Sequence, residues 1–379
     1  MASTAPPLQE SELQSWKLLA QFRARLRPHL ATNPKSPTEQ DPRHTVLAED
    51  YFCLLLFGLL NPALKSMRAL CRASRRFAKM REVCTQPFTQ TAFSESQHVF
   101  APEALAGVLR ELATQAQGRA EFGDHRVRAA LAALTAVDGT ALRALNRMTW
   151  TPACGIGCAV KLHLEFAVFD DVPADWTITP GKVCERQTWR AKARPGTCYV
   201  AHRHFSQDHQ MLAELQATKI DFVLRLCANI VRTPVGPARP LTPADVAAGV
   251  VSDRQERLGA GAVSPEVRVV EIHAAGKVFL LITTRLDLPA EIIGLIYRYR
   301  WQIEVFFKWF KMILGCGHWL AESPAGVTIL LYSALIASLL LMLGTHTRPN
   351  KRQMEAIQLH FLGFVSETEL FAELNLEKS

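Results

Sequence analysis

An uncharged stretch of about 20 residues, 325–344, limits the folds open to this chain more than any other segment. A stretch of that length and composition either spans a bilayer or forms a helix buried on all sides in a protein core. It contains Thr328, Tyr332, Ser333 and Ser338, and no second segment of this kind exists. We therefore expect a buried helix of a large α/β domain. The alternative is a membrane protein with one span at 325–344.

The composition indicates a folded protein with a basic surface. Of 379 residues, 49% are hydrophobic and 21% are charged, which excludes a disordered chain or a fibre. Lys+Arg 43 against Asp+Glu 35 leaves a net charge of +8, which favours a polyanionic partner. The 9 cysteines are irregularly spaced and odd in number, and the polar start of the chain lacks a signal-peptide pattern. These features predict a cytoplasmic protein without a disulfide framework.

The pattern along the chain predicts three regions. Residues 1–130 have helical apolar spacing and no strand runs, so we expect an all-α amino-terminal region. Residues 131–345 read as an α/β domain with a β-rich insertion at about 215–288, and 346–379 as a short helical tail. Strands are expected at 134–137 (ending in Asp138-Gly139-Thr140), 158–169, 196–200, 222–226, 267–272 and 278–283. One long helix is expected from about Pro289 to Leu314, ended by Gly315 and Gly317.

Six cations in the amino-terminal region recur at helical spacing. We expect them on one face of a single helix, where like charges repel unless an anion compensates them. A duplex phosphate backbone would supply that anion. The alternative is a solvated surface covered by acids from elsewhere in the fold. The six are Lys65, Arg68, Arg72, Arg75, Arg76 and Lys79.

The expected long helix carries a narrow polar stripe formed by Tyr297, Arg300, Glu304 and Lys311. At helical periodicity these four side chains fall within a sector of about 60°. In an ordinary amphipathic helix, Glu304 would instead pair with Lys308 four residues on.

The spacing Tyr-x2-Arg-x3-Glu-x6-Lys, preceded by Asp138-Gly139-Thr140, resembles the signature of bacterial DDE transposases of insertion-sequence family four. The resemblance extends over about residues 45–345, including 61–64, 161–163 and 284–286. It implies a ribonuclease-H-like mixed sheet with helices, and two Mg²⁺ (or Mn²⁺) ions held by carboxylates that include Asp138 and Glu304. It also implies that Tyr297, Arg300 and Lys311 contact DNA.

By the same resemblance, the chain acts on double-stranded DNA, namely the terminal inverted repeats of a transposon and its target, as a homodimer in the DNA complex. The reaction would be metal-assisted phosphodiester hydrolysis followed by strand transfer. The alternative for Asp138 is a turn residue, which is the commoner use of an Asp-Gly dipeptide.

The second carboxylate of that family is missing here, because His202 occupies the expected aspartate position. Neutral imidazole is a poor ligand for Mg²⁺. Three interpretations remain open. The chain is a catalytically dead DNA-binding relic, or Asp208 takes over the role, or His202 binds a different metal with help from His204. The competing use of Asp208 is as the N-cap of the helix that follows it.

Two weaker patterns complete the survey. Cys154, Cys158 and His163 resemble part of a zinc site, although no second ligand pair follows at the usual spacing. Trp301, Trp309 and Trp319 could stack on an unpaired base. For Trp309 we favour a place in the core.

Overall fold

The computed structural model describes residues 15–118, 122–151, 153–154, 157–261, 263–315, 319–345 and 348–375. The chain divides into two compact units. Unit 1 comprises Met1–Ala120, Leu142–Ala159 and Phe307–Ser379, and unit 2 comprises Glu121–Ala141 and Val160–Phe306.

Unit 1 is built of helices around α13 (Pro324–Thr345). The others are α1 (Ser15–Thr32), α2 (Pro37–Gln40), α3 (Ala48–Leu60), α4 (Met67–Arg76), the 3₁₀ helix η1 (Ala78–Glu82), α5 (Gln90–Val99), α6 (Glu103–Ala116), α14 (Lys351–Phe361) and α15 (Glu367–Asn375). The helix α12 (Trp301–Leu314) crosses from unit 2 into unit 1.

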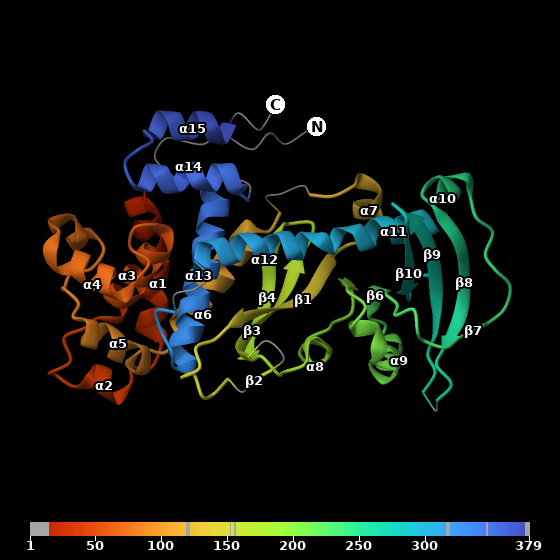
Figure 1. The fold of residues 1–379 in the computed structure, drawn as a ribbon, viewed down its shortest axis with the longest axis horizontal. Helices are drawn as coiled ribbons and strands as arrows, with labels where there is room; N and C mark the ends of the chain where they lie inside the picture. Colours follow the sequence, from red (N-terminus) through yellow and green to blue (C-terminus); the bar gives the residue numbers. More distant parts are fainter. Residues whose placement is uncertain are drawn as a thin grey trace. The chain divides into compact units, whose positions relative to one another are not determined.

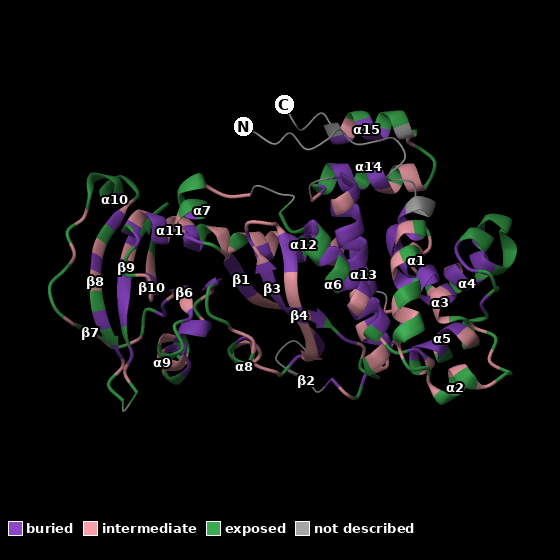
Figure 2. Cartoon of the chain, turned by 180° about the vertical axis from the view of Figure 1, so that it is seen from behind, coloured by how far each residue is buried: buried purple, intermediate pink, exposed green. Residues whose placement is uncertain are grey.

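Helix α13 contains the uncharged stretch and is the one described helix long and apolar enough to cross a membrane. Its most apolar window is 83% buried inside the protein, and it packs against α3, α5 and α6 (Figure 2). The hydroxyl groups of Ser338 and Thr345 donate to the carbonyl oxygens of Ala334 and Leu341, both at 2.8 Å. These two hydroxyl groups are thus bonded within the helix, as expected for a core helix.

The start of α13 is fixed by a side chain of α5. Gln97 Oε1 accepts hydrogen bonds from the backbone N–H groups of Glu322 and Ser323, at 2.6 and 2.9 Å. Ser323 Oγ in turn accepts from the N–H of Gly326 at 3.0 Å. These bonds satisfy donors that the first turn of a helix leaves free, so the apolar helix begins at a defined residue.

The six cations do not share a single helix, so that expectation was wrong. Ser66 caps α4 by accepting from the N–H of Ala69 at 3.2 Å, which leaves Lys65 before the helix. Phe77 adopts extended backbone and ends the helix, so Lys79 lies in η1. Arg68, Arg72, Arg75 and Arg76 remain on α4, and all four are exposed.

Unit 2 is organised by a mixed sheet, in agreement with the expected α/β class (Figure 1). The strand order is β4 (Val172–Pro180), β3 (Gly157–Ala167), β1 (Leu134–Arg143), β5 (Cys198–Ala201), β6 (Asp221–Arg225), β10 (Lys277–Thr283), β9 (Glu266–Ala274), β8 (Val250–Leu258) and β7 (Arg232–Pro234). A short strand, β2 (Ala153–Cys154), pairs with the start of β3. Strands β1, β5 and β6 are parallel, whereas the pairs from β6 through β10 to β7, and the pair β3 and β4, are antiparallel.

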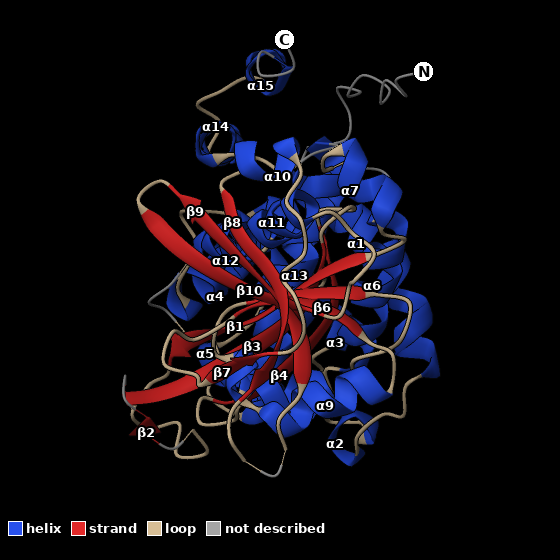
Figure 3. Ribbon diagram, turned by 90° about the vertical axis from the view of Figure 1, so that its right-hand side faces the viewer, coloured by secondary structure: helices blue, strands red, loops and turns tan. Residues whose placement is uncertain are grey.

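The strands rotate progressively across the sheet, as the twist of extended chains requires (Figure 3). The helices of unit 2 are α7 (His125–Ala130), α8 (Glu185–Arg190), the 3₁₀ helix η2 (Phe205–Gln207), α9 (His209–Ala217), α10 (Pro243–Ala247) and α11 (Ala290–Tyr299). Buried side chains of α8, η2 and α9 pack on the sheet as one core cluster that includes Trp189, Phe205 and Leu212.

Three details differ from the sequence expectations. Strands β4 and β8 were not expected, the latter because its charged residues lie in a polar interval. The dipeptide Asp138-Gly139 lies inside β1 and not in a turn. The expected long helix is two helices, because the N–H of Arg300 bonds the carbonyl of Tyr297 at 3.1 Å, and the regular helical pattern breaks there.

A buried ion pair joins β8 to β9. The guanidinium of Arg268, 1% exposed, donates to both carboxylate oxygens of Asp253 at 2.9 and 2.7 Å. It also donates to the carbonyl oxygens of Arg285 and Leu288 at 2.8 and 2.6 Å. All its bonds are made inside the protein, so the pair ties the two strands to the segment after β10.

We expect Asp253→Ala to destabilise the protein by about 3–5 kcal/mol, because it leaves a buried guanidinium without its counter-ion. Urea unfolding followed by circular dichroism measures the change. The control is Arg257→Ala, which removes an exposed pair with Glu266 on the same strands and should cost at most about 1 kcal/mol. Equal effects of the two substitutions would contradict the structural role of the buried pair.

Candidate metal centre

The parallel pairing of β1 and β5 brings Asp138 next to His202. Val137 on β1 lies opposite Ala201, the last residue of β5, so Asp138 and His202, which follows the end of β5, are the next residues along the two chains. Residues at the same position along neighbouring parallel strands lie side by side. His202 Nε2 is 3.4 Å from Asp138 Oδ1 as a result. The first predicted carboxylate and the substituted second position therefore share one site.

Glu185, at the start of α8, completes the cluster. Its Oε2 lies 3.5 Å from His202 Nε2. Its Oε1 lies 3.4 Å from the ammonium nitrogen of Lys161. Helix α8 is held on the sheet by Trp189, whose ring packs 5.5 Å from Tyr199 and 5.4 Å from Phe205. Glu185 was not expected from the sequence, because only the fold brings this isolated acid to Asp138.

Asp138, Glu185 and His202 form the one group of His, Cys, Asp and Glu in the described part of the chain that could hold a metal ion. One ligand atom from each residue lies within 4.8 Å of the others. The carboxylates are mostly buried, with side chains 12% and 14% exposed, whereas the imidazole is 31% exposed. Two carboxylate oxygens and one imidazole nitrogen suit a borderline divalent ion better than Mg²⁺.

The two carboxylates also change the protonation of His202. Burial alone would lower the pKa of His202, but hydrogen bonds to Asp138 and Glu185 outweigh it and raise the pKa to about 9. The N–H of His204 points at His202 Nδ1 from 3.2 Å and opposes a proton there. The two anions prevail, because a charge stabilises the imidazolium more than one peptide dipole opposes it. The imidazolium therefore neutralises charge between the carboxylates.

Glu304 is not part of this group. Its carboxylate pairs with the guanidinium of Arg300, four residues earlier on the chain. The Arg300 guanidinium carbon lies 5.6 Å from the centre of the Tyr297 ring. Three of the four stripe residues are thus in contact with one another, and Lys311 lies in the part of α12 that belongs to unit 1.

The alternatives for the second ligand are placed as follows. Asp208 accepts from the N–H of Met211 at 3.0 Å and caps α9, which is the structural use weighed for it. His204 lies past the end of β5, in a turn, and its ring centre is 6.0 Å from that of His202. It is not a member of the metal-binding group.

The structure gives different outcomes for the possible zinc ligands and for the three tryptophans. His163 is buried and its Nε2 bonds Thr179 Oγ1 at 2.8 Å, while the side chain of Cys154 lies outside the described residues. Trp309 is buried, which confirms its expected place in the core. Trp301 is 50% exposed, and the indole N–H of Trp319 donates to the carbonyl of Arg143 at 2.7 Å.

Comparison with known proteins assigns the family. The family described as "Transposase DDE domain" matches residues 131–340. This chain belongs to that family. The matched range contains Asp138, Glu185, His202 and Glu304. Members of such domains generally use divalent metals, which agrees with the ligand types gathered in the cluster.

Two curated relatives are similar over part of their length. "Putative transposase y4zB" of Sinorhizobium fredii is 27% identical over 215 residues, 55% of this chain and 60% of the relative. "Probable transposase for insertion sequence element IS5377" of Geobacillus stearothermophilus is 25% identical over 236 residues, 61% of each protein. The similarity thus spans about three fifths of the curated relatives. A solved piggyBac transposase synaptic complex with hairpin DNA is 11% identical, with 97% of this chain and 80% of that chain covered and a TM-score of 0.45.

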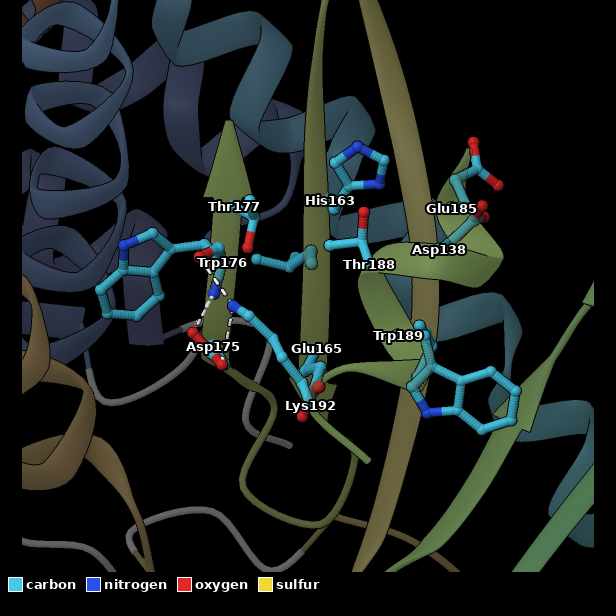
Figure 4. Close-up of a pocket in the computed structure, with 12 residues that line it drawn as sticks. Asp138, His163, Glu165, Asp175, Trp176, Thr177, Glu185, Thr188, Trp189 and Lys192 are labelled. Atoms are coloured by element: carbon cyan, nitrogen blue, oxygen red, sulfur yellow. Dashed lines mark hydrogen bonds and ion pairs between the residues drawn. The ribbon is translucent and has the colours of Figure 1, made fainter. Parts of the chain in front are cut away.

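The DDE domain holds a pocket lined by residues of β1, β3, β4 and α8, among them Asp138 and Glu185 of the metal-binding group (Figure 4). The side chain of Glu165 on β3 lines it and is buried, and neither carboxylate oxygen has a hydrogen-bond partner in the described part of the chain. Burial, with a smaller contribution from Asp175, raises the pKa of Glu165 to about 7. Lys192 is paired with Asp175 at 2.9 Å.

This buried acid predicts a pH dependence of stability. Between its usual pKa of 4.5 and about 7, Glu165 keeps its proton in the folded protein and loses it in the unfolded chain. Its contribution to the free energy of unfolding is therefore fully present below pH 4.5, and about 3 kcal/mol of it is lost as the pH rises to 7. We expect Glu165→Gln to remove this part of the decline, measured by urea unfolding at pH 5 and pH 8. The exposed control Glu95→Gln should leave the pH profile unchanged, and a variant profile parallel to wild type would contradict the assignment.

Proposed function

We propose that this chain is the DNA transposase of an insertion sequence, which cleaves and joins phosphodiester bonds at the ends of the element. The observation that carries the proposal is the meeting of Asp138, Glu185 and His202 inside a domain of the DDE family. The Tyr297, Arg300, Glu304 and Lys311 spacing supports membership of insertion-sequence family four. The names of both curated relatives describe transposases.

The strand order supports a ribonuclease-H-like sheet. Strands β4, β3, β1, β5 and β6 are consecutive, and the last three are parallel. Strands β10, β9, β8 and β7 extend that sheet, and we propose that they belong to a β-rich insertion at about 215–288. We further propose a functional division into residues 1–130, 131–345 and 346–379.

The residues proposed for chemistry are Asp138 and Glu304, with His202 at the position of the expected second aspartate. The resemblance implies two Mg²⁺ or Mn²⁺ ions. A divalent ion supplies charge stabilisation to the phosphodiester and lowers the pKa of bound water. Within the protein, Arg300 holds the Glu304 carboxylate through their ion pair, and Lys161 does the same for Glu185.

The proposed partner is double-stranded DNA, both the terminal inverted repeats and the target, bound by a homodimer associated with the bacterial nucleoid. Five exposed cations support DNA contact in unit 1: Arg68, Arg72, Arg75, Arg76 and Lys79. Among the residues that the structure describes, none of these cations, nor Lys65, makes an ion pair with an acid, so no covering by acids is seen there. In unit 2, Tyr297 and Arg300 are the proposed contacts, together with Lys311 of α12.

A second candidate function is a DNA-binding relic without catalysis. The observation that favours it is the imidazole of His202 between two carboxylates, where a cation-binding carboxylate is expected. Such a protein would still bind terminal repeats through its basic residues.

A nicking assay separates the two functions. A terminal-repeat duplex is incubated with wild type and with His202→Asp, in Mg²⁺ and in Mn²⁺. A transposase cleaves in at least one metal, and His202→Asp should raise cleavage in Mg²⁺ at least tenfold because it restores a hard oxygen ligand. If both proteins bind the duplex and neither cleaves it, the carboxylate set assigned here is wrong.

The DNA contact of α4 has its own test. We expect Arg72→Ala with Arg76→Ala to weaken binding and to lower the slope of log K against log salt concentration by about 2, one unit for each lost phosphate contact. Fluorescence anisotropy at salt concentrations of roughly 50 to 200 mM measures both the affinity for DNA and the salt slope. The control pair, Arg43→Ala with Lys277→Ala, removes the same charge from other exposed positions. Equal slopes for the two double variants would show that the DNA does not contact α4.

A further inference from the structure

We propose that Glu185 supplies the second carboxylate ligand of this site, in place of the one lost at position 202, and that Asp138, Glu185 and His202 together hold one Mn²⁺-type ion. The inference rests on the proposed function for its biological meaning. The metal binding itself is measured without DNA, so each can fail separately.

The spacing of the three ligand atoms fits a single ion. Two atoms each about 2.1 Å from one ion lie about 3 to 3.5 Å apart, depending on the coordination geometry. His202 Nε2 is 3.4 Å from Asp138 Oδ1 and 3.5 Å from Glu185 Oε2. Both distances from the imidazole nitrogen therefore match the separation of two ligands of one ion, and one ligand atom of each of the three residues lies within 4.8 Å of the others.

Gly139 makes the approach of Glu185 to β1 possible. A Cβ atom on Gly139 would lie 2.8 Å from both Cγ and Oε1 of Glu185. Real Cβ atoms do not come that close to other heavy atoms, so a side chain at 139 would require the side chain of Glu185 to shift from this position. The glycine thus leaves a space beside Asp138 that the side chain of Glu185 fills.

The rest of the surroundings fix the direction of Glu185. Lys161 binds Oε1 and also donates to the carbonyl of Val183 at 3.1 Å, which orients the carboxylate and leaves Oε2 toward His202. Trp189, on the same short helix, is 1% exposed and belongs to the core of the sheet. Lys161 and Gly139 are positioning residues in this arrangement, and Glu185 is the ligand.

The chemistry of the donors selects the ion. A pair of carboxylates suits Mg²⁺ and Mn²⁺ alike, but the imidazole nitrogen favours Mn²⁺ and later transition metals over Mg²⁺. The exchange of aspartate for histidine also removes one negative charge, which weakens the attraction for a second divalent ion. A single site with preference for Mn²⁺ follows.

The test is Mn²⁺ binding to the full-length protein without DNA, followed by the loss of the free Mn²⁺ signal in electron paramagnetic resonance. We expect one bound ion per chain, and weaker competition by Mg²⁺. Glu185→Gln should raise the Kd at least tenfold. The control Glu214→Gln removes an acid from the surface of α9, where it pairs with Arg190, and should leave the Kd unchanged.

Gly139→Ala tests this space beside Asp138 with all three ligands present. It should raise the Kd for Mn²⁺ as Glu185→Gln does, while circular dichroism shows a folded protein. His202→Asp should keep one binding site and increase the affinity for Mg²⁺ relative to Mn²⁺. Unchanged Mn²⁺ affinity in folded Glu185→Gln, or no binding to wild type at millimolar Mn²⁺, would overturn the proposal. Loss of DNA cleavage with intact Mn²⁺ binding would overturn the proposed function instead.

Discussion

The parallel pairing of β1 with β5 is the constraint on which the site depends. With Val137 opposite Ala201, the next residue of each strand must face the other, and a shift of one residue would turn one of the two side chains to the opposite face of the sheet. Strand β6 continues the parallel pairing, and α8 and α9 pack on these strands through a common core. The position of Glu185 then follows from Trp189, four residues later on α8, whose burial sets the height and rotation of the helix.

Those parts of the fold that local pattern determines could be predicted from the sequence. The uncharged stretch was correctly expected to be buried, because its apolar residues exceed what one helix face can expose, and Trp309 was correctly expected in the core. Asp138 was expected at the end of a short strand, yet β1 continues to Arg143. Local pattern did not predict the break at Arg300 or the short extent of α4. Helix α4 begins at the cap Ser66 and ends where Phe77 adopts extended backbone, and neither feature changes the periodicity of the sequence. Glu185 could not be found this way, since its partner Asp138 lies 47 positions earlier and no motif links them.

The electrostatics of the cluster explain how the chain tolerates a histidine at position 202. Carboxylates held close together repel one another when no cation is present, which raises the free energy of the folded state. Here His202 and Lys161 both carry donors toward the acids, so Asp138 and Glu185 are balanced within the protein. The same balance makes a metal ion compete with a proton for His202 Nε2. A site of this kind gains stability without metal and gives up part of its affinity for metal.

The dipeptide Asp138-Gly139 does not form the turn that its sequence suggests. Asp-Gly commonly marks a turn because glycine adopts positive φ there, yet in this chain Gly139 lies in the middle of β1 and is not among the residues with positive φ. What the position requires is the absence of a side chain, since a Cβ would collide with Glu185. The glycine next to the first acid is therefore explained by a neighbour that only the tertiary structure provides. For the same reason, the evolutionary and mutational tolerance of position 139 should depend on the residue at 185: a shorter side chain there would free the space that forbids a Cβ at 139.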